Sequence, residues 1–278
     1  MILIDYSQIA LSNIIVQKLN DESMIRHMIL NSIRMYNKKH RDEYGQVVIC
    51  ADGMNTWRKD FFPEYKAHRR KNRDESDQDW NEIFRILHTV RDEIRDYLPY
   101  KVIHMEGVEA DDIIGTLVMQ TQEFGMDEPV MIISSDKDFI QLQKYDNVKQ
   151  YSPITKKLVD GIDPKVYIKE HVLKGDKSDG VPNVLSPDHT FTDELRQRPL
   201  TSKKLESILA QDIDELDDEI KRNYQRNDKL INLDNIPKTL ESEILNSFNE
   251  ASYGDRSGLL NYFIEKRLTS LTENIGEF

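Results

Sequence analysis

Short apolar runs alternate with longer amphipathic stretches along the first 150 residues of the chain. The apolar runs are typical of buried strands and cover residues 1–5, 46–51, 101–105 and 131–134. Between them, apolar residues recur at helical spacing over residues 22–44, 80–99 and 109–124. This alternation predicts an α/β fold in which helices cover both faces of a twisted, parallel sheet.

After about residue 151 the strand pattern thins, and the rest of the chain predicts helices joined by polar loops. Asp163 followed by Pro164 is typical of a helix start, and Gly175 of the end of that helix. Further short helices are predicted at residues 205–209, 216–224, 240–248 and 259–268. We therefore expect two domains, an α/β core of residues 1–160 and a smaller helical domain of residues 161–278.

Acidic residues follow the predicted strands or begin the next helix. They are Asp5, Asp52, Glu109, Asp111, Asp112, Asp136 and Asp138. In a parallel sheet these positions meet at the carboxyl edge, where ligands bind. Closely spaced carboxylates repel, so they persist where a cation holds them or where all of them face water. Helical spacing places Glu109 and Asp112 on one face, and we expect Asp111 to face a metal ion.

Oxygen ligands without histidine or thiolate favour Mg²⁺ or Mn²⁺ over Zn²⁺. The acids outnumber the ligands that one ion needs, and a pair of ions suits the hydrolysis of a phosphodiester. A single-metal aspartyl phosphatase with Asp5 as nucleophile is a weaker alternative, because position 7 holds Ser7 where a second acid is expected.

Residues 53–79 lack clear periodicity and mix basic with aromatic side chains. The members are Trp57, Arg58, Lys59, Phe61, Phe62, Tyr65, Lys66, Arg69, Arg70, Lys71 and Arg73. Such a mixture suits single-stranded nucleic acid, whereas a charge run alone is usually a solvated face. The neighbouring acids favour the nucleic-acid interpretation.

Charge and composition set further limits. The formal net charge of −12 argues against nonspecific coating of nucleic acid, although it allows a local basic face. No apolar run approaches the roughly 18 residues of a membrane span, so we expect a cytoplasmic protein without membrane contact. The single cysteine, Cys50, lies in an apolar run and is expected to be a buried structural thiol.

These features resemble the flap endonuclease or 5′ nuclease superfamily, and within it the ribonucleases H of T-even-type bacteriophages. The resemblance covers nearly the whole chain, and its motifs lie at residues 3–10, 109–112, 134–139, 173–179 and 271–278. It implies a PIN-like nuclease core with a basic arch or bridge over residues 53–79. It also implies a helix-turn-helix DNA-binding element in the C-terminal domain, with a monovalent cation bound there.

The resemblance also implies residue roles. One Mg²⁺ would be held by Asp5, Asp52, Asp111 and Asp136, and a second by Asp138 and Asp179, with Mn²⁺ able to substitute. Glu109, Asp112 and Asp176 would act on the ions through water, and Glu109 and Lys66 join the metal-holding acids as catalytic residues. The nucleic-acid-binding residues would be Arg58, Tyr65, Lys66, Arg69, Gly175, Lys177 and Ser178.

The implied activity is 5′ to 3′ exonuclease and flap endonuclease cleavage of RNA–DNA hybrids, flaps and nicked duplex DNA. A monomeric enzyme of this kind would remove RNA primers from lagging-strand fragments during phage DNA replication in the host cytoplasm. A single-strand-binding protein and a sliding clamp are the implied protein partners. The alternatives are a non-catalytic DNA-junction scaffold of the replisome and a PIN-type ribonuclease.

Two segments carry further expectations. After Asn183 the chain departs from many relatives, which continue with a glycine-rich hairpin whose amides bind phosphate. At the C-terminus, Leu268, Leu271, Ile275 and Phe278 form an apolar series that predicts a tail docked on its own domain. A peptide that binds a replication partner is the alternative interpretation of this tail.

Overall fold

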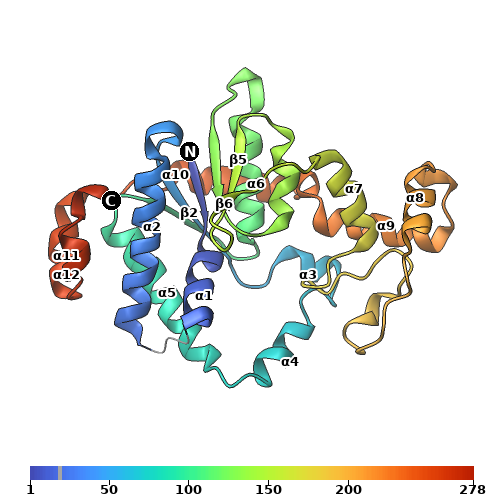
Figure 1. Ribbon diagram of the computed structural model, residues 1–278, viewed down its shortest axis with the longest axis horizontal. Helices are drawn as coiled ribbons and strands as arrows, with labels where there is room; N and C mark the ends of the chain where they lie inside the picture. The colour runs from blue at the N-terminus through green and yellow to red at the C-terminus, as the bar shows by residue number, and fades with distance from the viewer. Residues whose placement is uncertain (18–20) are drawn as a thin grey trace. The chain divides into compact units, whose positions relative to one another are not determined.

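The computed structural model describes residues 1–17 and 21–278, which form two compact units (Figure 1). Unit 1 comprises residues 1–54, 79–160 and 238–278, and unit 2 comprises residues 55–78 and 161–237. The predicted division after residue 160 differs from these units in two segments. Residues 55–78 pack within unit 2, and residues 238–278 pack within unit 1.

Unit 1 follows the predicted alternation of strands and helices. Its strands are β1 (Ile2–Asp5), β2 (Val47–Ala51), β3 (Lys101–His104), β4 (Val130–Ile133), β5 (Val148–Ser152) and β6 (Lys157–Leu158). Its α-helices are α1 (Tyr6–Gln17), α2 (Glu22–Tyr44), α5 (Trp80–Tyr97), α6 (Ala110–Thr121), α10 (Lys238–Glu250), α11 (Leu259–Glu265) and α12 (Thr269–Thr272). Its 3₁₀ helices are η1 (Glu123–Gly125), η2 (Lys137–Lys144), η6 (Arg256–Gly258) and η7 (Ile275–Glu277).

The strands form one sheet in the order β3-β2-β1-β4-β5-β6. The pairs up to β4·β5 are parallel, as predicted, and β6 pairs antiparallel with β5. The sequence did not predict β5 and β6. Strand β5 lacks a continuous apolar run because Lys149 is exposed and Gln150 is a buried polar residue.

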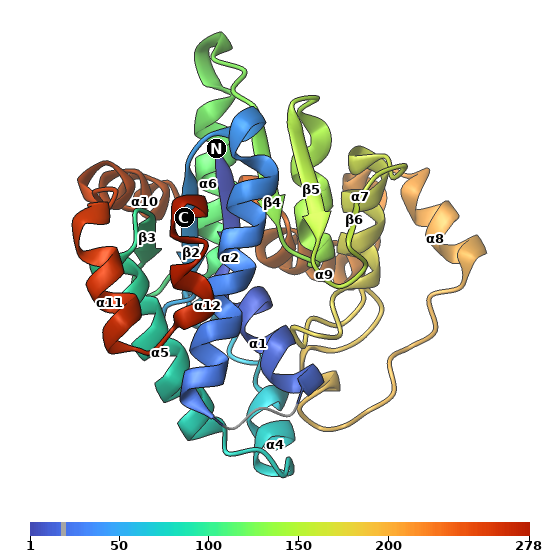
Figure 2. The same cartoon turned by 60° about the vertical axis from the view of Figure 1, so that its left-hand side comes forward.

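Both faces of the sheet are covered, because alternate residues of β1 point to opposite sides. Ile2 and Ile4 belong to the core cluster that includes α2 and α5, whereas Leu3 is buried outside that cluster. Helix α2 packs against β1 and β4, and α6 packs against β1 and β2 (Figure 2). Cys50 is buried, as predicted, and burial raises the pKa of its thiol.

The C-terminal tail docks on unit 1, as the apolar series predicts. Leu268, Leu271 and Phe278 are buried in the core cluster that contains α2 and α5. The side-chain amide of Asn37 donates to the carbonyl of Glu277 (2.8 Å), and Arg34 and Lys38 form ion pairs with the Glu277 carboxylate. These contacts explain why residues 238–278 belong to unit 1.

Replacing Phe278 by alanine is expected to lower the free energy of unfolding by about 3–5 kcal/mol, because it removes a fully buried ring. Ile264→Ala, at a side chain that is 62% exposed on α11, is the matched control and should change stability by less than about 0.5 kcal/mol. Urea denaturation measures both. Equal stability of the two variants would show that the tail is not docked.

Unit 2 is mainly helical. Its elements are α3 (Trp57–Phe61), α4 (His68–Asp74), α7 (Pro164–Lys174), η3 (Asp188–Thr190), α8 (Ser202–Leu209), η4 (Ile213–Glu215), α9 (Asp218–Ile231) and η5 (Leu233–Asn235). Helix α7 begins as predicted, since Asp163 Oδ1 accepts hydrogen bonds from the amides of Lys165 (2.8 Å) and Val166 (3.2 Å). It ends at Gly175, which has a positive φ of 67°.

Two small cores hold unit 2 together. One core joins α7, α8 and the residues before α9 through Leu173, Leu205 and Leu216. The other joins Phe62 and Tyr65 to Leu230 and Ile231 at the end of α9. The second core explains why residues 55–78 pack within unit 2. Among the helices of the described residues, none combines the length and apolar character needed to cross a membrane.

Candidate functional site

Unit 1 places acidic side chains at the carboxyl edge of its sheet. Asp5 is the last residue of β1, and the parallel register aligns it with Cys50, two residues before Asp52. Asp136 is the N-cap of η2, three residues after the end of β4, and Ile133 of β4 pairs with Ile4 of β1. The predicted meeting of these strand ends at one edge is therefore present.

Hydrogen bonds tie the strand ends together. Ser134 Oγ donates to Asp5 Oδ2 (2.9 Å) and accepts from the amide of Asp136 (3.1 Å). The side-chain amide of Gln150 donates to the carbonyls of Ser134 (3.0 Å) and Asp136 (2.6 Å). The amide of Asp138 donates to Asp136 Oδ1 (3.0 Å). These bonds fix the backbone that carries Asp136 and Asp138 relative to Asp5.

Asp52 is held between α1 and α6. Its carboxylate accepts hydrogen bonds from Ser7 Oγ (2.6 Å) and from the amide of Ala110 (2.9 Å), the first residue of α6. The start of α6 therefore faces a negative charge, which suits the positive end of a helix dipole.

The three acids at the start of α6 differ in their surroundings. Asp112 is fully buried, and its Oδ2 accepts a hydrogen bond from the amide of Glu109 (3.0 Å). Asp111 is only partly buried and is the more accessible of the two aspartates. Asp112 is therefore bonded to an amide inside the fold, and the role of Asp111 at a metal ion stays a prediction.

Crowding of these carboxylates affects the pKa of Asp5. Burial and the charges of Asp52 and Asp136 raise that pKa to about 7, against hydrogen bonds from Gln8 and Ser134 that lower it. A divalent cation would relieve this repulsion. The donor set consists of carboxylate oxygens, which fits Mg²⁺ or Mn²⁺.

Unit 2 brings Asp179 together with the basic segment. The Asp179 carboxylate accepts hydrogen bonds from Tyr65 Oη (2.7 Å) and Arg69 Nη2 (2.6 Å), and Lys66 Nζ lies 3.5 Å away. The amide of Lys66 also donates to the Asp179 carbonyl (2.7 Å), and Arg69 Nε donates to the Ser178 carbonyl (3.1 Å). Three residues predicted to bind nucleic acid therefore surround an acid predicted to bind metal.

Asp176 lies in the same turn. Its Oδ1 accepts from the amide (2.6 Å) and hydroxyl (2.7 Å) of Ser178, and its Oδ2 lies 3.5 Å from His171 Nε2. Burial acts to raise the pKa of Asp176, but the bonds from His171 and Ser178 outweigh it and hold that pKa well below its usual value. Asp176 is therefore a stable carboxylate that organises the turn from Gly175 to Ser178.

Two predicted nucleic-acid-binding residues are part of the fold instead. Arg58 is only 3% exposed, and its Nε donates to the carbonyl of Leu230 (2.9 Å). Tyr65 is 2% exposed and packs in the core with Phe62. Both face the end of α9, so neither presents its side chain to solvent. Both side chains thus belong to the packing of unit 2, and their contact with nucleic acid stays a prediction.

A close backbone contact explains why position 175 holds glycine. A Cβ built there would lie 2.4 Å from the carbonyl oxygen of Val181, so only glycine allows this close approach. Lys177 and Ser178 follow it and are exposed, as a contact with nucleic acid requires.

Several residues that support the acids were not predicted. They are Ser7, Ser134, Gln150 and His171, each bonded to an acid or to the backbone beside one. The sequence holds a signal for the two serines, which is their spacing from a candidate acid. Ser7 follows Asp5 by two positions, and Ser134 precedes Asp136 by two. Gln150 and His171 act through contacts that sequence spacing does not reveal.

Sequence comparisons identify the family. Residues 2–173 match the family described as 5′-3′ exonuclease, N-terminal resolvase-like domain, and residues 163–278 match the family described as T4 RNase H, C terminal. The ribonuclease H of Enterobacteria phage T4 is 38% identical over 99% of this chain and 95% of its own length. A 5′-3′ exonuclease of Buchnera aphidicola is 30% identical over 56% of this chain and 53% of its own length.

Solved structures share the fold. A bacteriophage T5 5′-exonuclease with bound zinc ions matches 100% of this chain and 98% of its own, with 16% identity and a TM-score of 0.63. The T5 flap endonuclease in a complex with DNA and metal ions matches 99% and 97%, with 16% identity and a TM-score of 0.60. With these matches along its whole length, the chain belongs to the 5′-3′ exonuclease family that carries the T4 RNase H C-terminal domain.

Proposed function

We propose that this chain is a magnesium-dependent 5′ to 3′ exonuclease and flap endonuclease that removes RNA primers during phage DNA replication. The observation that carries the proposal is the crowding of Asp5, Asp52 and Asp136 at the carboxyl edge of the sheet. Relatives named as a ribonuclease H and as 5′-3′ exonucleases support the reaction class. The T5 flap endonuclease complex supports DNA as a substrate.

Within unit 1, Asp5, Asp52, Asp111 and Asp136 would hold one divalent ion. A second ion on Asp138 and Asp179, with Glu109, Asp112 and Asp176 acting through water, stays a prediction of the resemblance. Two such ions, when bound, supply a nucleophile from water at neutral pH and stabilise the leaving oxygen of the phosphodiester. The monovalent cation in the helix-turn-helix also stays a prediction.

The residues around the acids would fix the orientation of the carboxylates in this metal centre. Ser134 and Gln150 hold Asp5 and the Asp136 loop in place, and Ser7 orients the Asp52 carboxylate. Ligands held by such supporting bonds bind metal more tightly than free carboxylates, because less freedom is lost on binding.

The basic side chains of unit 2 would bind the phosphates of the substrate. Lys66 and Arg69 form ion pairs with the Asp179 carboxylate in this structure, and the same cationic groups suit the phosphate oxygens of a 5′ strand. Lys177 and Ser178 lie on the same turn as Asp179 and would extend this contact. Because its apolar anchors are buried, we do not propose the C-terminal tail as a partner peptide.

Cleavage of a 5′-labelled flap and of a nicked RNA–DNA hybrid, with Mg²⁺ and with EDTA, tests the proposal. We expect cleavage of both with Mg²⁺ alone, and loss of cleavage without loss of substrate binding in Asp111→Asn. Binding should persist because removing a carboxylate reduces its repulsion of phosphate. Absence of cleavage by the wild type with Mg²⁺ or Mn²⁺ would favour the junction-binding scaffold instead.

Lys66→Ala and Arg69→Ala are each expected to weaken binding of a 5′ single strand. Removing one phosphate contact should reduce the slope of log affinity against log salt by about 0.7 for single-stranded DNA. Anisotropy titrations across a salt series measure this slope, with Lys149→Ala, an exposed residue of β5, as the control. Slopes equal to that of the control would show that the basic segment is a solvated face that does not bind the phosphates of the strand.

A further inference from the structure

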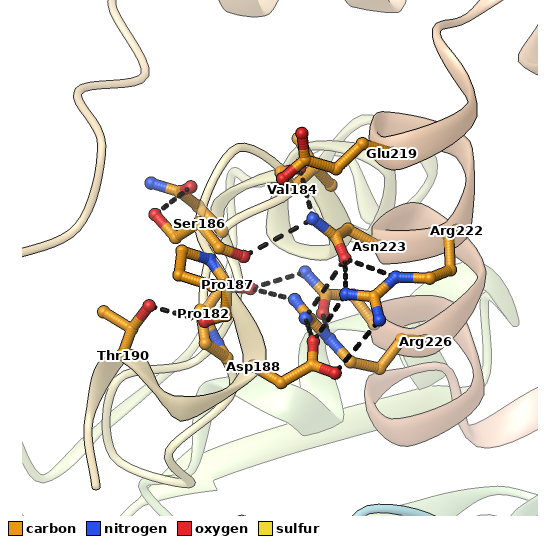
Figure 3. Close-up of polar contacts among 12 residues, drawn as sticks. Pro182, Val184, Ser186, Pro187, Asp188, Thr190, Glu219, Arg222, Asn223 and Arg226 are labelled. Atoms are coloured by element: carbon orange, nitrogen blue, oxygen red, sulfur yellow. Dashed lines mark hydrogen bonds and ion pairs between the residues drawn. The ribbon is translucent and has the colours of Figure 1, made fainter. Parts of the chain in front are cut away.

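Many buried polar side chains of this protein have hydrogen-bond partners. Figure 3 shows an example in unit 2, where Asn223 and Arg226 of α9 donate to the carbonyls of Val184 (2.9 Å) and Pro182 (2.8 Å). Tyr100 of unit 1 differs, because its hydroxyl is buried and has no hydrogen-bond partner among the residues that the structure describes. Burying a hydroxyl without a partner costs free energy, so this group is a candidate contact for a ligand.

Tyr100 lies at the amino edge of the sheet, where β2 and β3 begin. It directly precedes β3, and Gln46 directly precedes β2, the parallel neighbour of β3. The loop before η6 contacts this edge closely, since a Cβ built at Gly254 would lie 2.1 Å from the carbonyl oxygen of Leu98. The acids described above follow the opposite, carboxyl ends of the strands. A ligand beside Tyr100 would therefore bind at the other edge of the sheet from the proposed metal centre.

Tyr100 lines a pocket of about 310 Å³ within unit 1. Arg41 in the last turn of α2 and Arg256 of η6 are the cations among the lining residues. Asp255 is the acid among them, and its Oδ1 accepts a hydrogen bond from the amide of Ser257 (3.0 Å). In a chain with a net charge of −12, a pocket with two cationic side chains and one acidic side chain is a local positive region.

The two arginines of this pocket are available to a ligand. Both are exposed, and neither guanidinium group takes part in a hydrogen bond or an ion pair with another described residue. Burial raises the pKa of Tyr100, and the charges of Arg256 and Arg41 oppose this rise, which places both guanidinium groups near the hydroxyl. Other arginines of unit 1 are paired with carboxylates, namely Arg26, Arg34, Arg85, Arg91 and Arg95. Arg41, Arg256 and Tyr100 therefore form a set of unused donors around one pocket.

We propose that this pocket binds the phosphate group of a mononucleotide, with Arg41, Arg256 and the Tyr100 hydroxyl as hydrogen-bond donors. A guanidinium group binds phosphate through two parallel hydrogen bonds, and a hydroxyl can donate to a further oxygen. The volume lies at the lower end of the range for ligand pockets, which suits one nucleotide rather than an oligonucleotide. The proposal is independent of the nuclease function, because no acid of the metal centre lines the pocket.

Tyr253 gives a reason to expect a nucleotide rather than free phosphate. It lines the pocket and is 40% exposed. Lys101 Nζ lies over one face of its ring, 5.1 Å from the ring centre. A base can stack on the other face, and stacking on an aromatic ring adds affinity for any base. The base would therefore bind at Tyr253 while the phosphate binds at the arginines.

Isothermal titration calorimetry with deoxyadenosine 5′-monophosphate in EDTA tests the proposal. We expect the wild type to bind the nucleotide with a Kd below about 1 mM. Arg41→Ala with Arg256→Ala should weaken binding at least about ten-fold, because this variant lacks both charge-assisted donors. The charge-matched control is Lys149→Ala with Lys157→Ala, two exposed residues of β5 and β6, and it should bind within about two-fold of wild type.

Two further ligands identify the contacts. Deoxyadenosine lacks the phosphate and inorganic phosphate lacks the base, so each should bind at least about ten-fold more weakly than the monophosphate. Deoxyadenosine that binds as tightly as the monophosphate would overturn the phosphate site, and inorganic phosphate that does so would overturn the nucleotide as the ligand. The proposal also fails if the wild type binds no nucleotide, or if the arginine variant binds it like the control.

Tyr100→Phe separates a ligand contact from a structural role. We expect a loss of affinity of about five-fold or more, because the variant lacks one donor to the phosphate. The melting temperature of the ligand-free variant should equal or exceed that of the wild type, because phenylalanine fills the same space without burying an unpartnered hydroxyl. A structural hydroxyl predicts a lower melting temperature and unchanged affinity, and that result would overturn the contact.

Lys66→Ala with Arg69→Ala separates the pocket from the proposed substrate contacts of unit 2. This variant should bind the mononucleotide like the wild type, since neither residue lines the pocket. Arg41→Ala with Arg256→Ala should in turn cleave the flap with Mg²⁺ like the wild type, because its acids and its basic segment are unchanged. Loss of mononucleotide binding in the Lys66 and Arg69 variant, with normal binding in the Arg41 and Arg256 variant, would overturn the pocket and leave the proposed function standing.

Discussion

Replacing Asp5 by asparagine is expected to reduce flap cleavage by orders of magnitude and to stabilise the metal-free protein above pH 7. Cleavage should fall because the variant lacks a carboxylate at the centre of the proposed metal site. Stability should rise because the same carboxylate is buried beside Asp52 and Asp136, whose charges oppose its ionisation. Ser134 and the amide of Gln8 still have hydrogen-bond partners on the asparagine.

The sign of the effect follows from the pKa. Folding raises the pKa of Asp5 from 3.8 to about 7, so between these values the folded protein holds a proton that the unfolded chain releases. Stability is therefore lost as pH rises from about 4 to about 7 and then stays level. Asparagine does not titrate, so the free energy of unfolding of Asp5→Asn should exceed that of the wild type. This difference should grow across the window to about 2–4 kcal/mol.

Urea denaturation in EDTA at pH 5 and pH 8 measures this advantage. Asp146→Asn, at an exposed aspartate of unit 1, is the matched control and should show little change at either pH. An Asp5→Asn variant with the stability of wild type at pH 8 would contradict the crowding of charges at this edge.

Gly53→Ala is expected to lower both stability and cleavage, because it moves the loop that carries Asp52. A Cβ built at Gly53 would lie 1.7 Å from the carbonyl oxygen of Met105 and 2.7 Å from its carbon. The amide of Gly53 donates to the carbonyl of Val108 (2.8 Å), so the loop cannot shift without straining this bond. We expect a loss of about 2–4 kcal/mol in the free energy of unfolding.

The control for Gly53→Ala is Gly258→Ala, because a Cβ there meets nothing within 4 Å. Thermal unfolding and flap cleavage of both variants should separate them clearly. Gly258→Ala should behave like the wild type. A stable and fully active Gly53→Ala protein would mean that the loop after β2 has room that the structure does not show.

Periodicity and strand ends allowed the core of unit 1 to be predicted. Helix α5 begins after Asp79, which accepts a hydrogen bond from the amide of Glu82 (3.0 Å), as the acidic run before it predicts. The acids at the strand ends meet because the carboxyl ends of parallel strands lie at the same edge of the sheet. These features depend on local sequence and on sheet geometry alone.

The features that were missed depend on contacts between distant residues. Gln150 interrupts the apolar pattern of β5, yet it is buried because the carbonyls of Ser134 and Asp136 accept its amide. Arg58 was predicted to bind nucleic acid as part of the basic segment, and only its bond to Leu230 reveals its structural role. The packing of residues 55–78 and 238–278 is equally long-range, so the unit boundaries did not follow from composition.

The most direct test of the central claim is a titration of the protein with Mn²⁺, followed by the decrease of the free-ion signal in electron paramagnetic resonance. We expect that wild type binds two Mn²⁺ ions, that Mg²⁺ competes for them, and that Asp5→Asn and Asp136→Asn each bind at least one fewer. Asp146→Asn should bind like the wild type. Equal binding by all four proteins would contradict the claim that the carboxylates at the sheet edge form the metal centre.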